Sequence, residues 1–96
     1  MRVELSEEAR AQVEVIDEWW RRNRRSSPTL FQDELEGTLV RLGQAPGLGT
    51  VFTSGKRVTR RILLPRTLYH LYFVEHDDCL FVVAVWGAVR GKGPDL

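Results

Sequence analysis

Hydrophobic residues recur with helical spacing in the first half of the chain. Ser6 is predicted to cap the start of a first helix, because two acidic residues that favour a helix N-terminus follow it. One face of this helix is marked by apolar positions at i, i+4, i+7 and i+11, which are Ala9, Val13, Ile16 and Trp20. A second apolar stripe, widened by Leu39, consists of Phe31, Leu35, Thr38 and Leu42.

The limits of the second helix are predicted from its flanking residues. Ser27 is a suitable N-cap and Pro28 a suitable first helical residue, so the helix is expected to begin there. Gly43 is expected to end it. Only a few residues separate the two helices, which should therefore form an antiparallel hairpin over about residues 6–43.

The pattern becomes strand-like from about residue 50. Leu80–Trp86 is apolar at every position, which is typical of a central strand buried on both faces. Met1–Leu5 alternates weakly and fits a strand added to a larger sheet. The glycine-rich residues 87–96 are expected to be irregular. The other predicted strands are Thr50–Thr53, Val58–Leu64 and Leu68–Val74.

The order of these elements predicts an α+β fold. A short N-terminal strand precedes the antiparallel two-helix hairpin, and the hairpin packs on one face of a 3–4-stranded, mainly antiparallel sheet. We expect a single domain over residues 1–96, with the hairpin at about 6–43, the sheet at about 50–86 and a tail at 87–96. A chain of 96 residues can form one two-layer core.

Composition narrows the class of protein. Apolar residues make up 43% and charged residues 28%, so fibrous and disordered classes are excluded. No apolar run approaches the roughly 20 residues of a membrane span, and the first residues do not read as a signal peptide. A single cysteine, Cys79, cannot form an internal disulfide, so a reducing cytoplasm is the expected compartment and no membrane partner is expected.

The net charge of +1 conceals a strong asymmetry. Residues 1–18 hold six acids and two arginines, whereas residues 21–66 hold ten bases and three acids. A basic middle third indicates either an anionic partner or a solvated face paired with the chain's own acids. The charge pattern does not decide between these two interpretations.

Several segments, taken in order, resemble the ParE/RelE superfamily of bacterial toxin–antitoxin toxins. VELSEEARAQVEVIDEWW is similar to the first strand and helix of that family, and SPTLFQDELEGTLVRLGQAPGLG to its second helix and following loop. RRILLPRTLYHLYFVE and LFVVAVWGAVRGKGPDL resemble its core strands and terminal segment. The resemblance extends from Val3 to Leu96 and depends on the order and spacing of the segments.

The resemblance implies a plasmid-stabilisation or toxin–antitoxin protein that is neutralised by direct binding of a cognate antitoxin. An antitoxin strand or helix would dock along the helical hairpin and the sheet edge. RelE-like members cut mRNA in the ribosomal A site. ParE-like members poison DNA gyrase and carry out no chemistry of their own.

Residue chemistry favours the ParE-like activity. Metal-free RNA cleavage needs a base, an acid and cations that stabilise the phosphate. Trp86-Gly87 stands where related toxins often have a histidine, and no tyrosine follows Arg90. A gyrase inhibitor is therefore predicted, with a RelE-like ribosome-dependent endoribonuclease and a non-toxic binding protein as alternatives. The residues expected to bind the target are Lys56, Arg57, Arg60, Arg61, Arg66 and Arg90, of which the last four would be catalytic in an endoribonuclease.

Individual residues have further predicted roles. Arg60 and Arg61 are adjacent in a strand and should point to opposite faces. His70 is expected to be half-buried rather than a catalytic base. The contiguous HDDC turn at 76–79 lacks the ligand spacing of a zinc site, so no metal and no cofactor are predicted. The residues expected to bind the antitoxin are Trp19, Arg22, Arg25 and Arg61.

Overall fold

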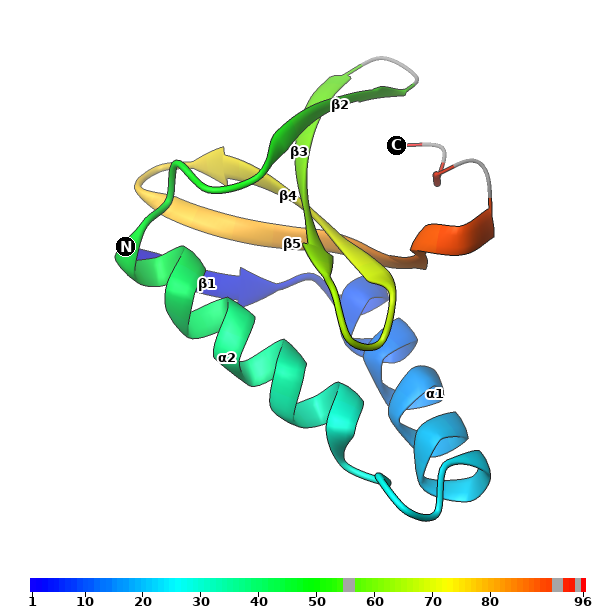
Figure 1. Cartoon of the computed structure of the whole chain (residues 1–96). Helices are drawn as coiled ribbons and strands as arrows, with labels where there is room; N and C mark the ends of the chain where they lie inside the picture. Colours follow the sequence, from blue (N-terminus) through cyan, green and yellow to red (C-terminus); the bar gives the residue numbers. More distant parts are fainter. Residues whose placement is uncertain (55–56, 91–92, 95) are drawn as a thin grey trace.

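The chain forms a five-stranded sheet with two helices packed against one of its faces (Figure 1). The computed structural model describes residues 1–54, 57–90, 93–94 and 96, except for the side chains of residues 54, 57 and 90. The elements are β1 (Arg2–Leu5), α1 (Glu7–Asn23), α2 (Leu30–Gln44), β2 (Thr50–Ser54), β3 (Arg57–Leu64), β4 (Tyr69–His76), β5 (Cys79–Gly87) and a 3-10 helix, η1 (Ala88–Arg90).

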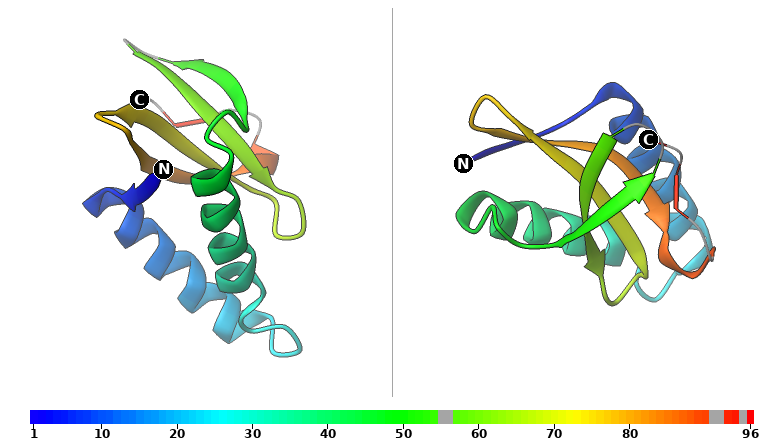
Figure 2. Two further views of the ribbon diagram at one scale, coloured as in Figure 1. Left: turned by 90° about the vertical axis from the view of Figure 1, so that its left-hand side faces the viewer. Right: turned by 90° about the horizontal axis from the view of Figure 1, so that it is seen from above.

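The sheet has the strand order β1-β5-β4-β3-β2. β1 runs parallel to β5, while β2, β3, β4 and β5 form an antiparallel meander (Figure 2). The predicted α+β fold is confirmed, and β1 brings the strand count slightly above the three to four expected for the sheet. β5 lies between β1 and β4, and each of its residues is buried or half-buried, in line with its apolar sequence.

α1 begins as predicted and packs on β5. The Ser6 hydroxyl accepts a hydrogen bond from the backbone amide of Ala9 at 3.1 Å and caps the helix. Ala9 and Trp20 are buried in the core. The Gln12 side-chain oxygen accepts a hydrogen bond from the backbone amide of Val85 at 2.7 Å, beyond the point where β1 ends. A polar side chain of the helix thus satisfies an amide of the sheet.

Both predicted limits of the second helix were wrong. α2 begins at Leu30 with Thr29 as N-cap, and the Thr29 hydroxyl donates to the Asp33 carboxylate at 3.1 Å. Gly43 lies inside the helix, which continues to Gln44. A Cβ atom on Gly43 would lie 3.0 Å from the backbone oxygen of Met1. This glycine therefore allows the N-terminus to approach closely and does not end the helix.

The core lies between the two helices and the sheet. Every residue of the predicted second stripe is buried, and Phe31 packs edge-on against Tyr69 of β4 with ring centroids 5.2 Å apart. The Trp20 indole donates to the Tyr69 hydroxyl at 3.3 Å, which joins the end of α1 to the same ring. In the part of the chain that the structure describes, no helix is long and apolar enough to span a membrane.

A glutamate of α2 holds the turn between β3 and β4. The Glu34 carboxylate accepts hydrogen bonds from the backbone amides of Arg66 and Thr67, at 2.8 and 2.9 Å. It also accepts one from the Thr67 hydroxyl at 2.7 Å. The next residue, Leu68, has a φ of 66°, which a residue with a side chain rarely adopts. The carboxylate thus stabilises a turn that is unfavourable locally.

Candidate functional site

Arg60 and Arg61 lie on opposite faces of the sheet, as predicted. Arg60 is on the helix-covered face, where its guanidinium lies 5.5 Å from the centroid of the Phe73 ring. It donates to the backbone oxygens of Pro46 at 3.0 Å and Leu48 at 2.6 Å, and to that of Gly47. Its donors therefore hold the loop before β2 and are occupied within the protein.

Arg61 lies on the face away from the helices. Its guanidinium lies 4.9 Å from the centroid of the Phe52 ring, and one nitrogen lies 3.4 Å from the hydroxyl oxygen of Tyr72. Among the described residues Arg61 forms no ion pair with a carboxylate. A half-buried cation stacked on an aromatic ring retains hydrogen-bonding capacity for an anionic group.

His70 and Tyr72 accompany Arg61 on this face, and we refer to the three residues as the Arg61–His70–Tyr72 cluster. The His70 and Tyr72 rings meet edge to face with centroids 6.0 Å apart. Burial lowers the pKa of His70, and the positive charge of Arg61 lowers it further. The cluster therefore combines an imidazole, a phenol and a guanidinium.

Sequence reasoning missed this cluster because it assessed each residue separately. His70 and Tyr72 are two positions apart in β4 and so share a face. The register pairs Arg61 directly with Tyr72 across β3 and β4. The alternation within β4 was visible in the sequence, but the register depended on the length of the turn.

The C-terminal tail packs on the same face of the sheet. A Cβ atom on Gly93 would lie 2.6 Å from the Phe52 ring and 2.8 Å from the Tyr72 hydroxyl oxygen. Pro94 is buried, and Tyr72 is only 1% exposed. In this arrangement the Tyr72 phenol is closed off from solvent.

The other predicted target-binding residues do not form a visible cluster. Lys56 lies outside the described residues, and so do the side chains of Arg57 and Arg90. Arg66 is exposed in the β3–β4 turn. Of the predicted set, Arg60, Arg61 and Arg66 therefore have described side chains, and they lie at three different places.

Three of the predicted antitoxin-binding residues lie at or just beyond the C-terminal end of α1. Trp19 is 44% exposed, and the Arg24 guanidinium lies 5.3 Å from its ring centroid. Arg22 pairs with Glu18 one turn earlier, and Arg25 is exposed. Arg61, the fourth member, lies on the far face of the sheet, so the four residues do not form one surface.

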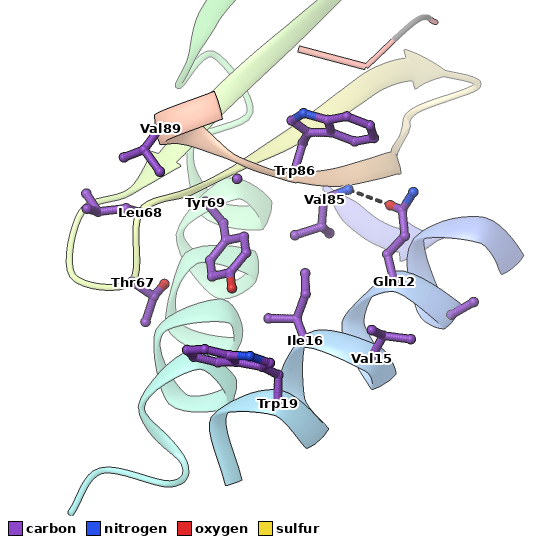
Figure 3. A pocket seen from close by; sticks show the side chains of 12 residues that line it. Gln12, Val15, Ile16, Trp19, Thr67, Leu68, Tyr69, Val85, Trp86 and Val89 are labelled. Atoms are coloured by element: carbon purple, nitrogen blue, oxygen red, sulfur yellow. Dashed lines mark hydrogen bonds between the residues drawn. The ribbon is translucent and has the colours of Figure 1, made fainter. Parts of the chain in front are cut away.

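An apolar groove of about 680 Å³ lies beside α1 (Figure 3). α1 forms one wall, and the end of β5, the β3–β4 turn and η1 form the other. Large apolar side chains remain accessible along it, including Val15 at 69%, Leu68 at 44% and Val89 at 77% exposure. The sequence did not indicate this groove, because its walls come from segments far apart in the chain.

Comparison with solved structures shows a shared fold. No protein-family model and no curated protein sequence matches the chain. The fold is similar to that of a chain in a solved structure described as a chromosomal ParDE TA system from P. aeruginosa, with a TM-score of 0.72. The two chains are 17% identical, and the match covers 91% of this chain and 95% of the other. At this identity the likeness shows that the two chains share a fold.

Proposed function

We propose that this chain is the toxin of a type II toxin–antitoxin module, of the ParE-like kind that inhibits DNA gyrase. The observation that carries the proposal is the near-complete structural match, at a TM-score of 0.72, to a chain of a ParDE system. The family resemblance in the sequence extends over the same elements. Fold alone does not determine function, so the proposal also depends on the residues described above.

The described arginines support a binding role more than a catalytic one. Arg60 is occupied by the backbone oxygens of residues 46–48, so it is not available to stabilise a phosphate. Tyr72 is buried beneath the tail. Arg61 and the exposed Arg66 retain free donors and are the described residues that we assign to contact with gyrase or its bound DNA. Lys56, Arg57 and Arg90 remain in the proposed target-binding set on sequence grounds.

Antitoxin binding is assigned first to the end of α1. Trp19, Arg22 and Arg25 present an accessible indole and two exposed guanidinium groups. An acidic antitoxin segment with an apolar anchor would complement this combination. Arg61 stays in the proposed antitoxin-binding set as a separate contact on the other face, which an antitoxin would reach only by wrapping around the sheet edge.

A gyrase cleavage assay tests the proposed target. Purified chain is added to DNA gyrase and supercoiled plasmid, with and without the cognate antitoxin. Accumulation of linear, gyrase-linked DNA that the antitoxin abolishes is the expected result. Arg61→Ala and Arg66→Ala should weaken this effect at least several-fold, whereas Arg10→Ala, at an exposed arginine of α1, should not. A folded chain that leaves gyrase unaffected would contradict the proposal.

One observation favours a RelE-like endoribonuclease as the second candidate. The Arg61–His70–Tyr72 cluster supplies a possible base, acid and phosphate-stabilising cation on one face. This activity would require the tail to leave Tyr72. Cleavage of mRNA on ribosomes that is lost in His70→Gln and in Tyr72→Phe, without any effect on gyrase, would establish this alternative. Normal growth on strong expression, with intact antitoxin binding, would instead indicate a non-toxic binding protein.

A further inference from the structure

The exposed face of α1 carries a regular stripe of residues. Glu8, Ala11, Val15, Trp19 and Arg22 are all exposed and follow one another at intervals of three or four positions. Because an α-helix turns by about 100° per residue, residues seven positions apart lie within about 20° of the same direction. The stripe is therefore one continuous line along the helix, with an apolar centre and charged ends.

This stripe is antisymmetric in charge about Val15. The acid Glu8 lies seven positions before Val15, and the base Arg22 lies seven positions after it. Ala11 and Trp19, one small and one large, lie four positions to either side. If a second copy of α1 is placed antiparallel across a two-fold axis at Val15, each acid faces a base and each tryptophan faces an alanine. The two helix dipoles are then also antiparallel.

We propose that this face joins two copies of the chain in a two-fold symmetric dimer, with α1 packed against α1 of the partner. Val15 contacts itself across the axis, Trp19 covers the partner's Ala11, and Glu8 pairs with the partner's Arg22. Val15 and Trp19, which form part of the α1 wall of the groove, are then covered by α1 of the other copy (Figure 3). An isologous contact of this kind closes on itself.

Charge complementarity selects a second copy in this orientation. A parallel pairing would oppose Glu8 to Glu8 and Arg22 to Arg22, which is repulsive at both ends. In the antiparallel pairing the remaining facing positions include Gln12 against the partner's Glu18, which is also compatible. The salt bridge between Arg22 and Glu18 within one helix is solvent-exposed, so Arg22 can pair with Glu8 of the partner at little cost.

The proposed dimer contains only two copies of this chain, so it does not depend on the proposed function. It does use Trp19 and Arg22, which we also assign to antitoxin binding. An antitoxin and a second copy would therefore compete for the end of α1. The antitoxin-free chain is consequently the form in which the dimer is expected.

Sedimentation velocity and light scattering of the full chain, without antitoxin, test the proposal over about 1–200 µM. We expect a dimer at the upper concentrations. Val15→Glu brings two carboxylates together on the axis and should raise the dissociation constant at least about tenfold. Val40→Glu is the matched control, since Val40 is 59% exposed on α2 outside the groove and its replacement should leave the dimer unchanged. A wild-type chain that stays monomeric throughout would overturn the proposal.

Charge reversal distinguishes this interface from any other self-association. Glu8→Arg alone and Arg22→Glu alone should each raise the dissociation constant about five- to tenfold, because each change affects two symmetry-related pairs. The double variant should return to within about threefold of wild type. Val15→Cys should form a cross-linked dimer under mild oxidation, whereas Val40→Cys should not. Additive losses in the double variant, or equal cross-linking of both cysteines, would refute the interface.

Discussion

Replacing Glu34 with alanine is expected to destabilise the fold more than any other change to a partly exposed residue discussed above. Its carboxylate accepts three hydrogen bonds from the β3–β4 turn, two from backbone amides and one from the Thr67 hydroxyl. No residue of the turn itself replaces this acceptor. Thr67 is only 8% exposed, so its amide and hydroxyl have little access to water once the carboxylate is gone.

The magnitude follows from these three bonds. The amide of Arg66 is in an exposed part of the turn and can bind water, so its loss costs about 0.5–1 kcal/mol. The two donors of Thr67 lose a charged acceptor in a buried place, which costs about 1.5–3 kcal/mol together. The expected loss in free energy of unfolding is therefore about 2–4 kcal/mol. For a domain of this size that lowers Tm by roughly 8–30 °C.

Urea and thermal denaturation followed by circular dichroism measure this loss. Glu34→Gln keeps one oxygen acceptor and should lose about half as much as Glu34→Ala. Glu36→Ala serves as the matched control, because Glu36 is exposed and, among the described residues, accepts only from Gln32 within the helix. Its effect should stay within about 0.5 kcal/mol. If Glu34→Ala matched this control, the turn would not depend on the carboxylate and the reasoning would fail.

Three further predictions concern the two faces of the sheet. Arg60→Ala should lower the urea-unfolding free energy by about 1.5–3 kcal/mol through loss of its bonds to the loop, and Arg61→Ala should lower it by less than about 1 kcal/mol. Because the pKa of His70 is lowered from 6.5 in the folded chain, stability that is present above pH 6.5 is lost as the pH falls through the folded pKa. Urea titrations at several pH values should show a smaller loss of unfolding free energy at low pH in His70→Gln. Gly93→Ala places a methyl group against Phe52 and should change the near-ultraviolet circular dichroism of the aromatic residues, at a cost of about 1–3 kcal/mol.

The helices were predictable because their signals are local and repeated. The buried face of α2 was indicated by three apolar residues and one threonine, and each of them is buried: Phe31, Leu35, Thr38 and Leu42. The limits of α2 were not predictable in the same way. Ser27 and Pro28 lie in a turn before the helix, and the contact of Gly43 with Met1 overrides its helix-ending tendency. The approach of Met1 to Gly43 brings together the first residue and the end of the hairpin, a contact that no local pattern indicates.

For the candidate site, strand alternation predicted which face of the sheet each residue occupies, but not which residues it contacts. Alternation placed Arg60 and Arg61 on opposite faces. It did not show that Arg60 binds the loop at residues 46–48, since this contact depends on how the loop folds over β3. It also did not show that His70 and Tyr72 join Arg61, because that juxtaposition requires the register of two strands.

The pairing of β1 with β5 has a consequence for synthesis of the chain. The Cys79 thiol donates to the Glu4 carboxylate, 75 positions away, and every β1–β5 contact spans a similar separation. During translation, β1 and both helices leave the ribosome well before the strand that completes their core. The nascent chain must therefore hold its apolar helix faces without a complete sheet until β5 emerges, and pairing over so long a separation slows folding. A stalled or prematurely terminated product would expose the whole core face of the hairpin.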